Sequence, residues 1–180
     1  PHPLTLADLR LTTTTSACGV CGTSSIEALM KQTRYEIPQV PVVPGVVAKL
    51  PSALSAEQKQ FRKTGGIHAA GAFTFDGEPI VVREDVGRHN AADKVIGHLL
   101  MEDKLPANDL ILVMSSRASF ELVNKAAMAG FGMLVAVSAA SSLAVETARE
   151  TGMALVGFAR GDRFNLYSGE LSRDTLPGRS

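Results

Sequence analysis

The two cysteines of this 180-residue chain stand three positions apart, a spacing at which thiols can do chemistry. Cys18 and Cys21 enclose Gly19 and Val20, and Gly22 follows. Four interpretations are possible: half of a structural zinc site, a thioredoxin-type redox pair, two unreactive thiols, or a nucleophilic pair that relays sulfur. A zinc site needs four ligands, so the pair would have to be completed by a second subunit. The spacing alone leaves all four open.

The sequence around the cysteines suits a sulfur relay. A relay needs a thiolate that attacks a persulfide, exposure to a partner protein, and an arm that moves between donor and acceptor. The threonines at 12–15 and the glycines beside the cysteines fit such an arm. A short helix expected to begin at Ser24 or Ser25 would favour the thiolate through its dipole.

Polar residues are also concentrated in segments that follow predicted strands, most of which lead into predicted helices. Three such segments are 83–90, 115–119 and 160–163. Ligands of α/β sheets usually bind at such junctions, and helix N-termini bind anions through free N–H groups. Arg88 and Arg117 stand beside two of the predicted helix starts, where their guanidinium groups would suit a diphosphate.

Alternating helices and strands are predicted to position these segments. Asp76-Gly77 predicts a hairpin turn, and Ser55 with Gln58 matches a capping box. The expected elements are a short helix at 24–30, an extended Pro-rich linker at 37–51, a helix at 55–64, hairpin strands at 67–75 and 79–82, a helix capped by Asn90 and reaching 100, a strand at 110–114, a helix at 119–130, a strand at 133–137, a helix at 141–152, and strands at 154–158 and 164–167. This order predicts an α/β fold, a three-layer α/β/α sandwich with a mixed sheet.

We expect two parts: residues 1–51 form a cysteine-bearing arm, a short helix and the Pro-rich linker, and residues 52–180 form the α/β domain. The chain starts at Pro1 rather than methionine, so we expect residues upstream of it.

Composition and charge exclude several classes of protein. Hydrophobic residues make up 45% and charged residues 20%, as in ordinary globular proteins. Eighteen basic residues balance eighteen acidic ones, so we expect neither a nucleic-acid partner nor a membrane partner. We expect no leader peptide, and no run reaches the roughly 18 apolar residues that span a membrane. With only two cysteines, a cytoplasmic protein is the simplest interpretation.

Five motifs occur in an order that resembles the FdhD family of formate dehydrogenase accessory sulfurtransferases. They are Ser16–Gly22, Thr64–Ala70, Arg83–Lys94, Ser116–Glu121 and Val137–Val145. The resemblance spans about residues 16–167, and the block that begins at Arg83 is highly specific. Members of that family usually carry a further N-terminal segment, so we expect this chain to be the C-terminal portion of a longer protein.

The resemblance implies a function, a cofactor and partners. Such proteins take sulfur from a cysteine desulfurase and deliver it to the bis-molybdopterin guanine dinucleotide form of the molybdenum cofactor, which formate dehydrogenase requires. The resemblance also implies a cytidine-deaminase-like fold, a homodimer, and guanosine diphosphate as a mimic of the cofactor. The catalytic residues are then Cys18 and Cys21, with Cys18 favoured as the persulfide carrier.

The motifs and the resemblance together predict the cofactor-binding residues. Glycines would allow a close backbone approach, and Asp85, Asp93 or Glu84 would accept hydrogen bonds from a guanine edge. Ordinary alternatives are helix caps and surface ion pairs. The predicted set is Gly65, Gly66, His68, Arg83, Asp85, Gly87, Arg88, His89, Asn90, Asp93, Lys94, Ser116, Arg117, Ser119, Phe158, Ala159, Arg160, Gly161, Asp162 and Arg163, of which the run from Phe158 to Arg163 rests on the resemblance alone.

Two other classes of function are weighed against the relay. A zinc nucleobase deaminase requires H-x-E and P-C-x-x-C motifs, but Ala91 stands where the glutamate is needed and 116–119 contains no thiol. The residues therefore argue against a deaminase, and we expect no zinc. A non-catalytic chaperone that binds a guanine nucleotide or the molybdenum cofactor, with a regulatory cysteine pair, remains as the alternative, and persulfide detection would separate it from the relay.

Overall fold

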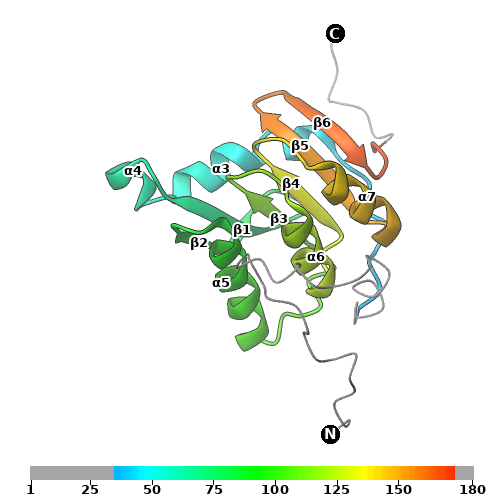
Figure 1. Ribbon diagram of the computed structural model, residues 1–180, viewed down its shortest axis with the longest axis horizontal. Helices are drawn as coiled ribbons and strands as arrows, with labels where there is room; N and C mark the ends of the chain where they lie inside the picture. Colours follow the sequence, from blue (N-terminus) through cyan, green and yellow to red (C-terminus); the bar gives the residue numbers. More distant parts are fainter. Residues whose placement is uncertain (1–34, 173–180) are drawn as a thin grey trace, which may run out of the picture. The chain divides into compact units, whose positions relative to one another are not determined.

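The computed structural model describes residues 35–172, and their centre is a six-stranded mixed sheet (Figure 1). The strand order is β2-β1-β3-β4-β5-β6. Strands β3, β4 and β5 are parallel, whereas β1 pairs antiparallel with β2 and β3, and β5 pairs antiparallel with β6. The strands are β1 (His68–Thr74), β2 (Pro79–Asp85), β3 (Leu110–Met114), β4 (Met133–Ala136), β5 (Ala154–Arg160) and β6 (Arg163–Ser168).

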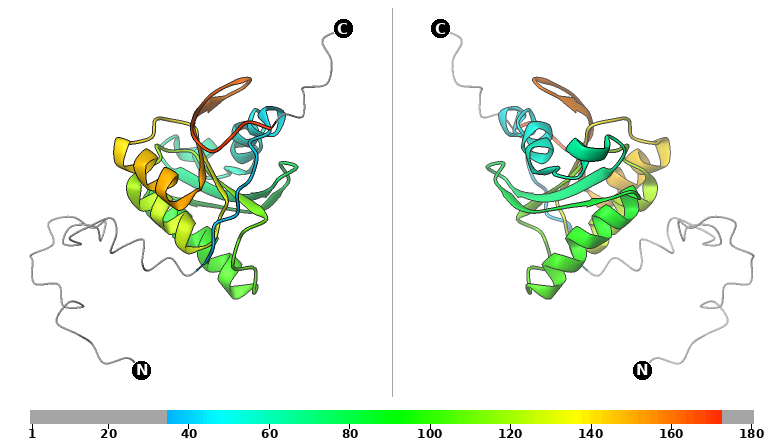
Figure 2. Two further views of the ribbon diagram at one scale, coloured as in Figure 1. Left: turned by 90° about the vertical axis from the view of Figure 1, so that its right-hand side faces the viewer. Right: turned by 90° about the vertical axis from the view of Figure 1, so that its left-hand side faces the viewer.

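Helices cover both faces of this sheet, so the predicted three-layer α/β/α sandwich is confirmed (Figure 2). One face carries α5 (Arg88–Met101), α6 (Phe120–Met128) and α7 (Ser142–Thr151), and the other carries α2 (Pro44–Val47) and α3 (Leu50–Glu57), while the short α4 (Phe61–Thr64) precedes β1. Alternate residues of β3 enter the two cores: Leu112 and Met114 pack with the α5–α7 layer, and Ile111 and Val113 with the α2–α3 layer.

The expected extended linker at 37–51 is wrong from Pro44 onward, where the chain forms α2 and the start of α3, whereas residues 37–43 lie in no helix and Val42 forms a β-bridge with Leu171. Pro44 is the first residue of α2 and Pro51 the second residue of α3, where the N–H that proline lacks would have no partner inside the helix. Val42 and Leu50 are fully buried, so the segment belongs to the core. The expected boundary between residues 51 and 52 therefore falls inside α3.

Most turn and cap signals are confirmed. Gly77 has φ of 91° in the hairpin between β1 and β2, and Gly65, with φ of 66°, ends α4. Ser119 and Ser141 are the N-cap residues of α6 and α7. These starts depend on nearby residues alone, which explains why the sequence predicts them.

Two predicted helix starts are wrong. Ser55 lies inside α3, which begins at Leu50, because the prolines initiate the helix earlier. Asn90 lies in the first turn of α5, whose N-cap is Gly87. The short helix expected at 24–30 lies outside the described residues.

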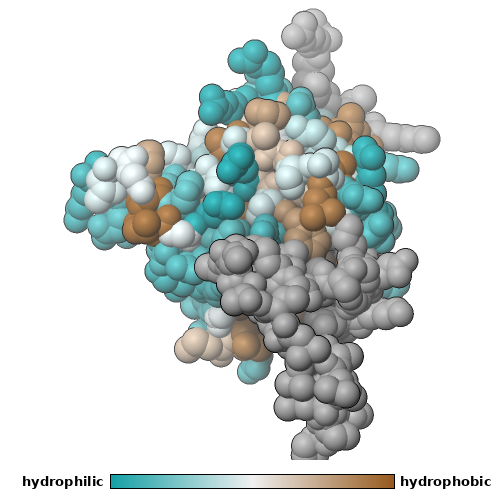
Figure 3. Space-filling view, in the orientation of Figure 1, coloured by the Kyte–Doolittle hydropathy of each residue, from teal (hydrophilic) through white to brown (hydrophobic). Residues whose placement is uncertain are grey.

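The face shown in Figure 3 is mostly hydrophilic, with small apolar areas, one of them near α4. Phe61, the single aromatic residue of α4, is 42% exposed. Among residues 35–172, no helix has both the length and the apolar character needed to cross a membrane.

Candidate functional site

The sheet topology brings the predicted binding segments to one edge. The loops after β3, β4 and β5 leave from the carboxyl edge of the parallel strands. Strand β2 runs in the same direction as β3 because both are antiparallel to β1, so the loop at 86–87 leaves from that edge too. The same topology brings Gly65, Gly66 and His68, at the start of β1, to this edge.

Three helix N-termini meet at a cavity of about 440 Å³ on the α5–α7 side of this edge, here called the Arg88–Arg117 cavity. The loops before α6 and α7 are joined by hydrogen bonds of 3.0 Å from Ala118 N to Ala139 O and from Ser141 N to Ala118 O. The residues that line the Arg88–Arg117 cavity are Arg88, Arg117, Ala118, Ser119, Phe120, Glu121, Ala139, Ala140, Ser141 and Leu143.

Two guanidinium groups at this cavity have no side-chain partner in the described part of the chain. Within residues 35–172, neither Arg88 nor Arg117 has a hydrogen-bonded or ion-paired side-chain partner, and the Nε atom of Arg88 is buried without one. An unpaired buried donor is costly unless a ligand or water satisfies it. The uncapped starts of α5 and α6 add free N–H groups and positive dipole ends. The arrangement is suited to bind an anion.

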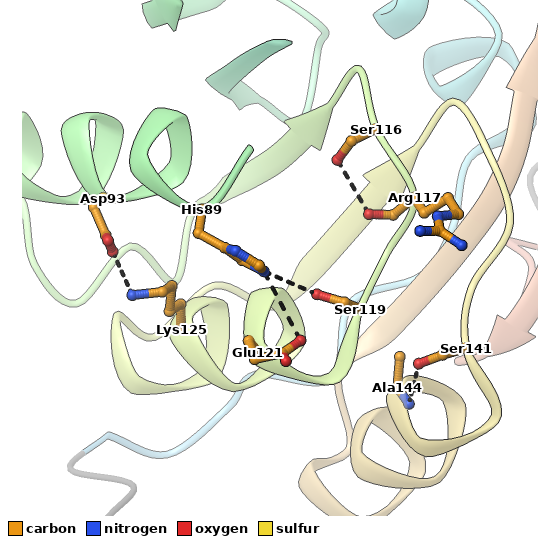
Figure 4. A network of polar contacts seen from close by, with 9 residues as sticks. All are labelled: His89, Asp93, Ser116, Arg117, Ser119, Glu121, Lys125, Ser141 and Ala144. Carbon is orange, nitrogen blue, oxygen red and sulfur yellow. Dashed lines mark hydrogen bonds and ion pairs between the residues drawn. The ribbon is translucent and has the colours of Figure 1, made fainter. Parts of the chain in front are cut away.

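His89 joins α5 to α6 beside the cavity (Figure 4). Its Nε2 atom lies 3.3 Å from Ser119 Oγ and 3.9 Å from Glu121 Oε2. Burial lowers the pKa of His89, and the charge of Arg88 lowers it further, while Glu121 opposes both. The lowered pKa favours the neutral form of the imidazole. A second link between these helices is the ion pair of Lys125 Nζ with Asp93 Oδ1, at 2.7 Å.

Asp85 organises the turn before α5 rather than facing the cavity. Its carboxylate accepts hydrogen bonds from Gly87 N at 2.8 Å, Asn90 Nδ2 at 3.2 Å and Lys94 Nζ at 2.5 Å. The hydrogen bond from Lys94, followed by that from Gly87, lowers the pKa of Asp85 to about 2. These partners all belong to the chain itself. The hydrogen bonds among Asp85, Asn90 and Lys94 therefore stabilise this turn.

Two further members of the Arg83–Asp85 segment are engaged within the chain. Glu84 accepts hydrogen bonds from Gln60 N at 2.7 Å and Phe61 N at 2.8 Å, at the start of α4. Arg83 donates to Val82 O at 2.9 Å and lies 3.4 Å from His98 Nδ1. Glu84 therefore joins β2 to the start of α4, and Arg83 lies between β2 and α5.

Several other predicted residues line two further cavities. Gly65, Gly66, His68, Ala159 and Arg160 line a cavity of about 450 Å³, here called the Gln58 cavity, whose other walls are Pro51, Leu54, Ser55, Gln58, Phe61, Ile67, Ser115 and Val137. A cavity of about 520 Å³ is lined by Phe158, Arg160, Asp162, Arg163, Phe164 and Asn165, and Arg160 is common to both. The single predicted cleft is thus divided among three cavities.

The strand β5 is distorted where it reaches this edge. Phe158 has φ of 51°, unusual for a residue other than glycine, and its side chain is 47% exposed. Its N–H donates to Ser138 O at 3.0 Å. Gly161, with φ of 54°, follows in the turn to β6. Strained and exposed residues of this kind are often found at functional sites.

Sequence reasoning did not include Gln58, Phe61 and Ser141 among the binding residues, although all three line cavities at this edge. Ser141 begins the helix predicted at 141–152, and this position could have suggested it. Ser116, which was included, is 5% exposed, and its hydroxyl donates to Arg117 O at 3.1 Å. Cys18 and Cys21 lie outside the described residues. Within 35–172, no three histidine, cysteine, aspartate or glutamate side chains are grouped to hold a metal ion.

Comparison with known proteins adds independent findings. A family model described as the FdhD/NarQ family matches residues 4–173. The chain is 63% identical over 158 residues to the "Sulfur carrier protein FdhD" of Corynebacterium efficiens, with 88% of this chain and 57% of the relative covered. It is 55% identical over 158 residues to the protein of the same name from Nocardia farcinica, with 87% and 57% covered. The chain therefore spans a little over half the length of these relatives.

A solved structure is also similar. It is the crystal structure of a proposed formate dehydrogenase accessory protein from Desulfotalea psychrophila, with a TM-score of 0.70 and 25% sequence identity. The similarity covers 81% of this chain and 60% of that protein.

Proposed function

Because the chain belongs to the FdhD/NarQ family, we propose that it carries sulfur from a cysteine desulfurase to the bis-molybdopterin guanine dinucleotide cofactor used by formate dehydrogenase. The name of its relatives, sulfur carrier protein, supports the transfer of sulfur. The name of the similar solved structure supports the link to formate dehydrogenase. The donor, the cofactor and the acceptor enzyme are parts of the proposal.

The observation that carries the proposed cofactor contact is the pair of guanidinium groups in the Arg88–Arg117 cavity, which have no side-chain partner among residues 35–172. A dinucleotide presents a diphosphate, and its oxygens would be bound by Arg88, Arg117 and the N–H groups at the starts of α5 and α6. Such charge-assisted hydrogen bonds are among the strongest in proteins. The volume of about 440 Å³ is within the range of small-molecule sites.

The two cysteines are sufficient for both steps of the proposed sulfur transfer, the loading of sulfur on Cys18 and its release by Cys21. In the first step, the Cys18 thiolate attacks the outer sulfur of the desulfurase persulfide, that S–S bond breaks, the desulfurase thiolate leaves, and a new S–S bond forms on Cys18. In the second step, the Cys21 thiolate attacks the Cys18 sulfur, and the outer sulfur leaves as hydrosulfide with both electrons of the broken bond. The disulfide that remains is then reduced by a cellular thiol.

Mass spectrometry tests this function. After incubation of the whole protein with a cysteine desulfurase and cysteine, the peptide holding residues 16–22 should gain the mass of one sulfur atom. The gain should disappear on treatment with a thiol reductant and should be absent from Cys18→Ala. A double Cys18→Ala/Cys21→Ala variant that still activates formate dehydrogenase would contradict the relay. It would favour a chaperone whose cysteines form a regulatory disulfide.

A further inference from the structure

The two serines that begin α6 and α7 occupy equivalent positions but make different contacts. Ser141 caps α7 in the usual way, by accepting a hydrogen bond from Ala144 N at 3.2 Å. Ser119 is the N-cap residue of α6 and has a similar extended backbone, with φ of −95° and ψ of 163°, yet its side chain forms no cap. The backbone of Ser119 therefore permits a cap that its hydroxyl does not make.

A histidine of the neighbouring helix contacts this hydroxyl instead. His89 Nε2 lies 3.3 Å from Ser119 Oγ (Figure 4). Either tautomer of the imidazole supports the contact, because Nε2 can donate to the hydroxyl or accept from it. Ser119 lines the Arg88–Arg117 cavity, whereas His89 does not. An effect of His89 on a ligand in the cavity would therefore pass through Ser119, its hydrogen-bond partner.

The start of α6 keeps a backbone donor at the cavity because the serine does not cap it. Leu122 N, the counterpart of Ala144 N, donates to Ser119 O at 3.1 Å and not to the serine hydroxyl. Phe120 lines the cavity, and its N–H forms no hydrogen bond within residues 35–172. Such N–H groups, together with the helix dipole, favour the binding of phosphate oxygens.

A separate observation indicates that an anion enters the same cavity. The Nε atom of Arg88 is buried, and it has no hydrogen-bond partner in the described part of the chain. A buried donor of this kind is costly unless a ligand or water satisfies it. Arg88 lines the cavity and directly precedes His89 in the first turn of α5. The uncapped helix start and the guanidinium group thus point to a ligand of the same charge.

We infer that His89 is a positioning residue that keeps the Ser119 hydroxyl away from the first turn of α6. The N–H groups of that turn then stay open to phosphate oxygens in the cavity. His89 acts from outside the cavity, by fixing the direction of a side chain that lines it. This inference rests on the proposed binding of a diphosphate and adds a role for a residue that does not touch the ligand.

The packing of α5 against α6 does not depend on His89 alone. One turn further along each helix, Lys125 Nζ forms an ion pair with Asp93 Oδ1 at 2.7 Å. Ala92 of α5 and Val123 of α6 are fully buried in the same core cluster. A substitution of His89 should therefore release the serine hydroxyl without separating the two helices.

A double-mutant cycle separates this role from a general structural one. Guanosine diphosphate should bind His89→Phe about tenfold more weakly than the wild type, because the freed serine caps α6 and competes with the ligand. In the His89→Phe/Ser119→Ala double variant, affinity should return to that of Ser119→Ala alone. Calorimetry measures the four affinities. The melting temperature of His89→Phe should not fall, since a cap has been gained.

A conservative variant provides the second readout. The amide of His89→Gln can still form a hydrogen bond with the Ser119 hydroxyl, so this variant should bind guanosine diphosphate nearly as well as the wild type does. Phenylalanine resembles the histidine ring more closely in shape but cannot form that hydrogen bond. A residue that only fills space would show the opposite order, with His89→Phe closer to the wild type than His89→Gln.

His98→Phe is the matched control, because His98 lies on the same helix and contacts Arg83 rather than Ser119. It should bind as the wild type does. Undiminished affinity in His89→Phe, or a double variant as weak as His89→Phe, would overturn the inference while the proposed function stands. If the wild type binds no guanosine diphosphate, the proposed diphosphate site and this inference fall together. Sulfur loading of residues 16–22 is measured separately and still tests the relay.

Discussion

Lys94 Nζ donates a hydrogen bond of 2.5 Å to Asp85 Oδ2, and this pair closes the turn that leads into α5. Lys94 also donates to Glu84 O at 3.1 Å, so one ammonium group ties the end of β2 to the helix. Arg88 and His89, which begin α5, follow this turn directly. The pair therefore helps to set the position of two residues at the candidate site.

The Asp85–Lys94 pair predicts a dependence of stability on pH. The folded pKa of Asp85 is lowered to about 2 from 3.8, so its contribution is present above about pH 4 and is lost as the pH falls toward 2. Asp85→Asn should lower the melting temperature at pH 6 and approach the wild type near pH 2. Thermal denaturation across this range measures it. Asp109→Asn, at an exposed position, is the control, and an equal effect of Asp85→Asn at both pH values would contradict the prediction.

Arg117→Ala should weaken the binding of guanosine diphosphate about ten- to a hundredfold, because the loss of a charged hydrogen bond costs about 1.5–3 kcal/mol. The melting temperature of the free protein should change little, since the guanidinium has no partner within residues 35–172. Calorimetry measures the affinity. Arg149→Ala is the control, because Arg149 lies in the last turn of α7 and does not line the cavity. Adenosine diphosphate should bind less well, because adenine lacks the O6 acceptor and N2 donors of guanine. Equal affinities for the two nucleotides would place the guanine site elsewhere.

Cys21→Ala should separate the loading of sulfur from its release. The variant should still gain one sulfur on the 16–22 peptide, because Cys18 is the proposed carrier. It should release little sulfide unless an external thiol is added, because the internal thiol that forms the disulfide is missing. Mass spectrometry and a sulfide assay measure the two steps. Rapid release of sulfide from Cys21→Ala without added thiol would show that the second cysteine has another role.

Glu84→Ala should destabilise the protein by about 1–2 kcal/mol, the usual effect of losing a side chain that accepts from backbone N–H groups at a helix start. The carboxylate receives the N–H groups of Gln60 and Phe61, so α4 should loosen from β2. Urea denaturation measures the change, and Glu78→Ala, in the turn just before β2, is the control. A variant as stable as the wild type would show that the two contacts contribute nothing.

The types of the elements from 68 to 168 could be predicted because their signals are local. Asp76-Gly77 specifies a tight turn by backbone conformation alone, and the apolar run at 110–114 is short and bounded as a buried strand should be. Ser119 and Ser141 mark helix starts for the same reason. By contrast, the extended linker expected at Pro44 and Pro51 is wrong, because proline both ends a helix and begins one, and only packing against the sheet decides which.

The sequence by itself determined the alternation of helices and strands, the mixed sheet it implies, and the motifs that point to one edge of that sheet. Only the tertiary structure decided which of the predicted polar residues remain free to meet a ligand. Asp85 and Glu84 are satisfied within the chain, whereas Arg88 and Arg117 are left without side-chain partners in the described residues. Contacts such as His89 with Ser119 join residues 30 positions apart, and no local pattern encodes them. They exist because parallel strands bring successive helix starts to the same edge, where side-chain geometry determines which groups pair.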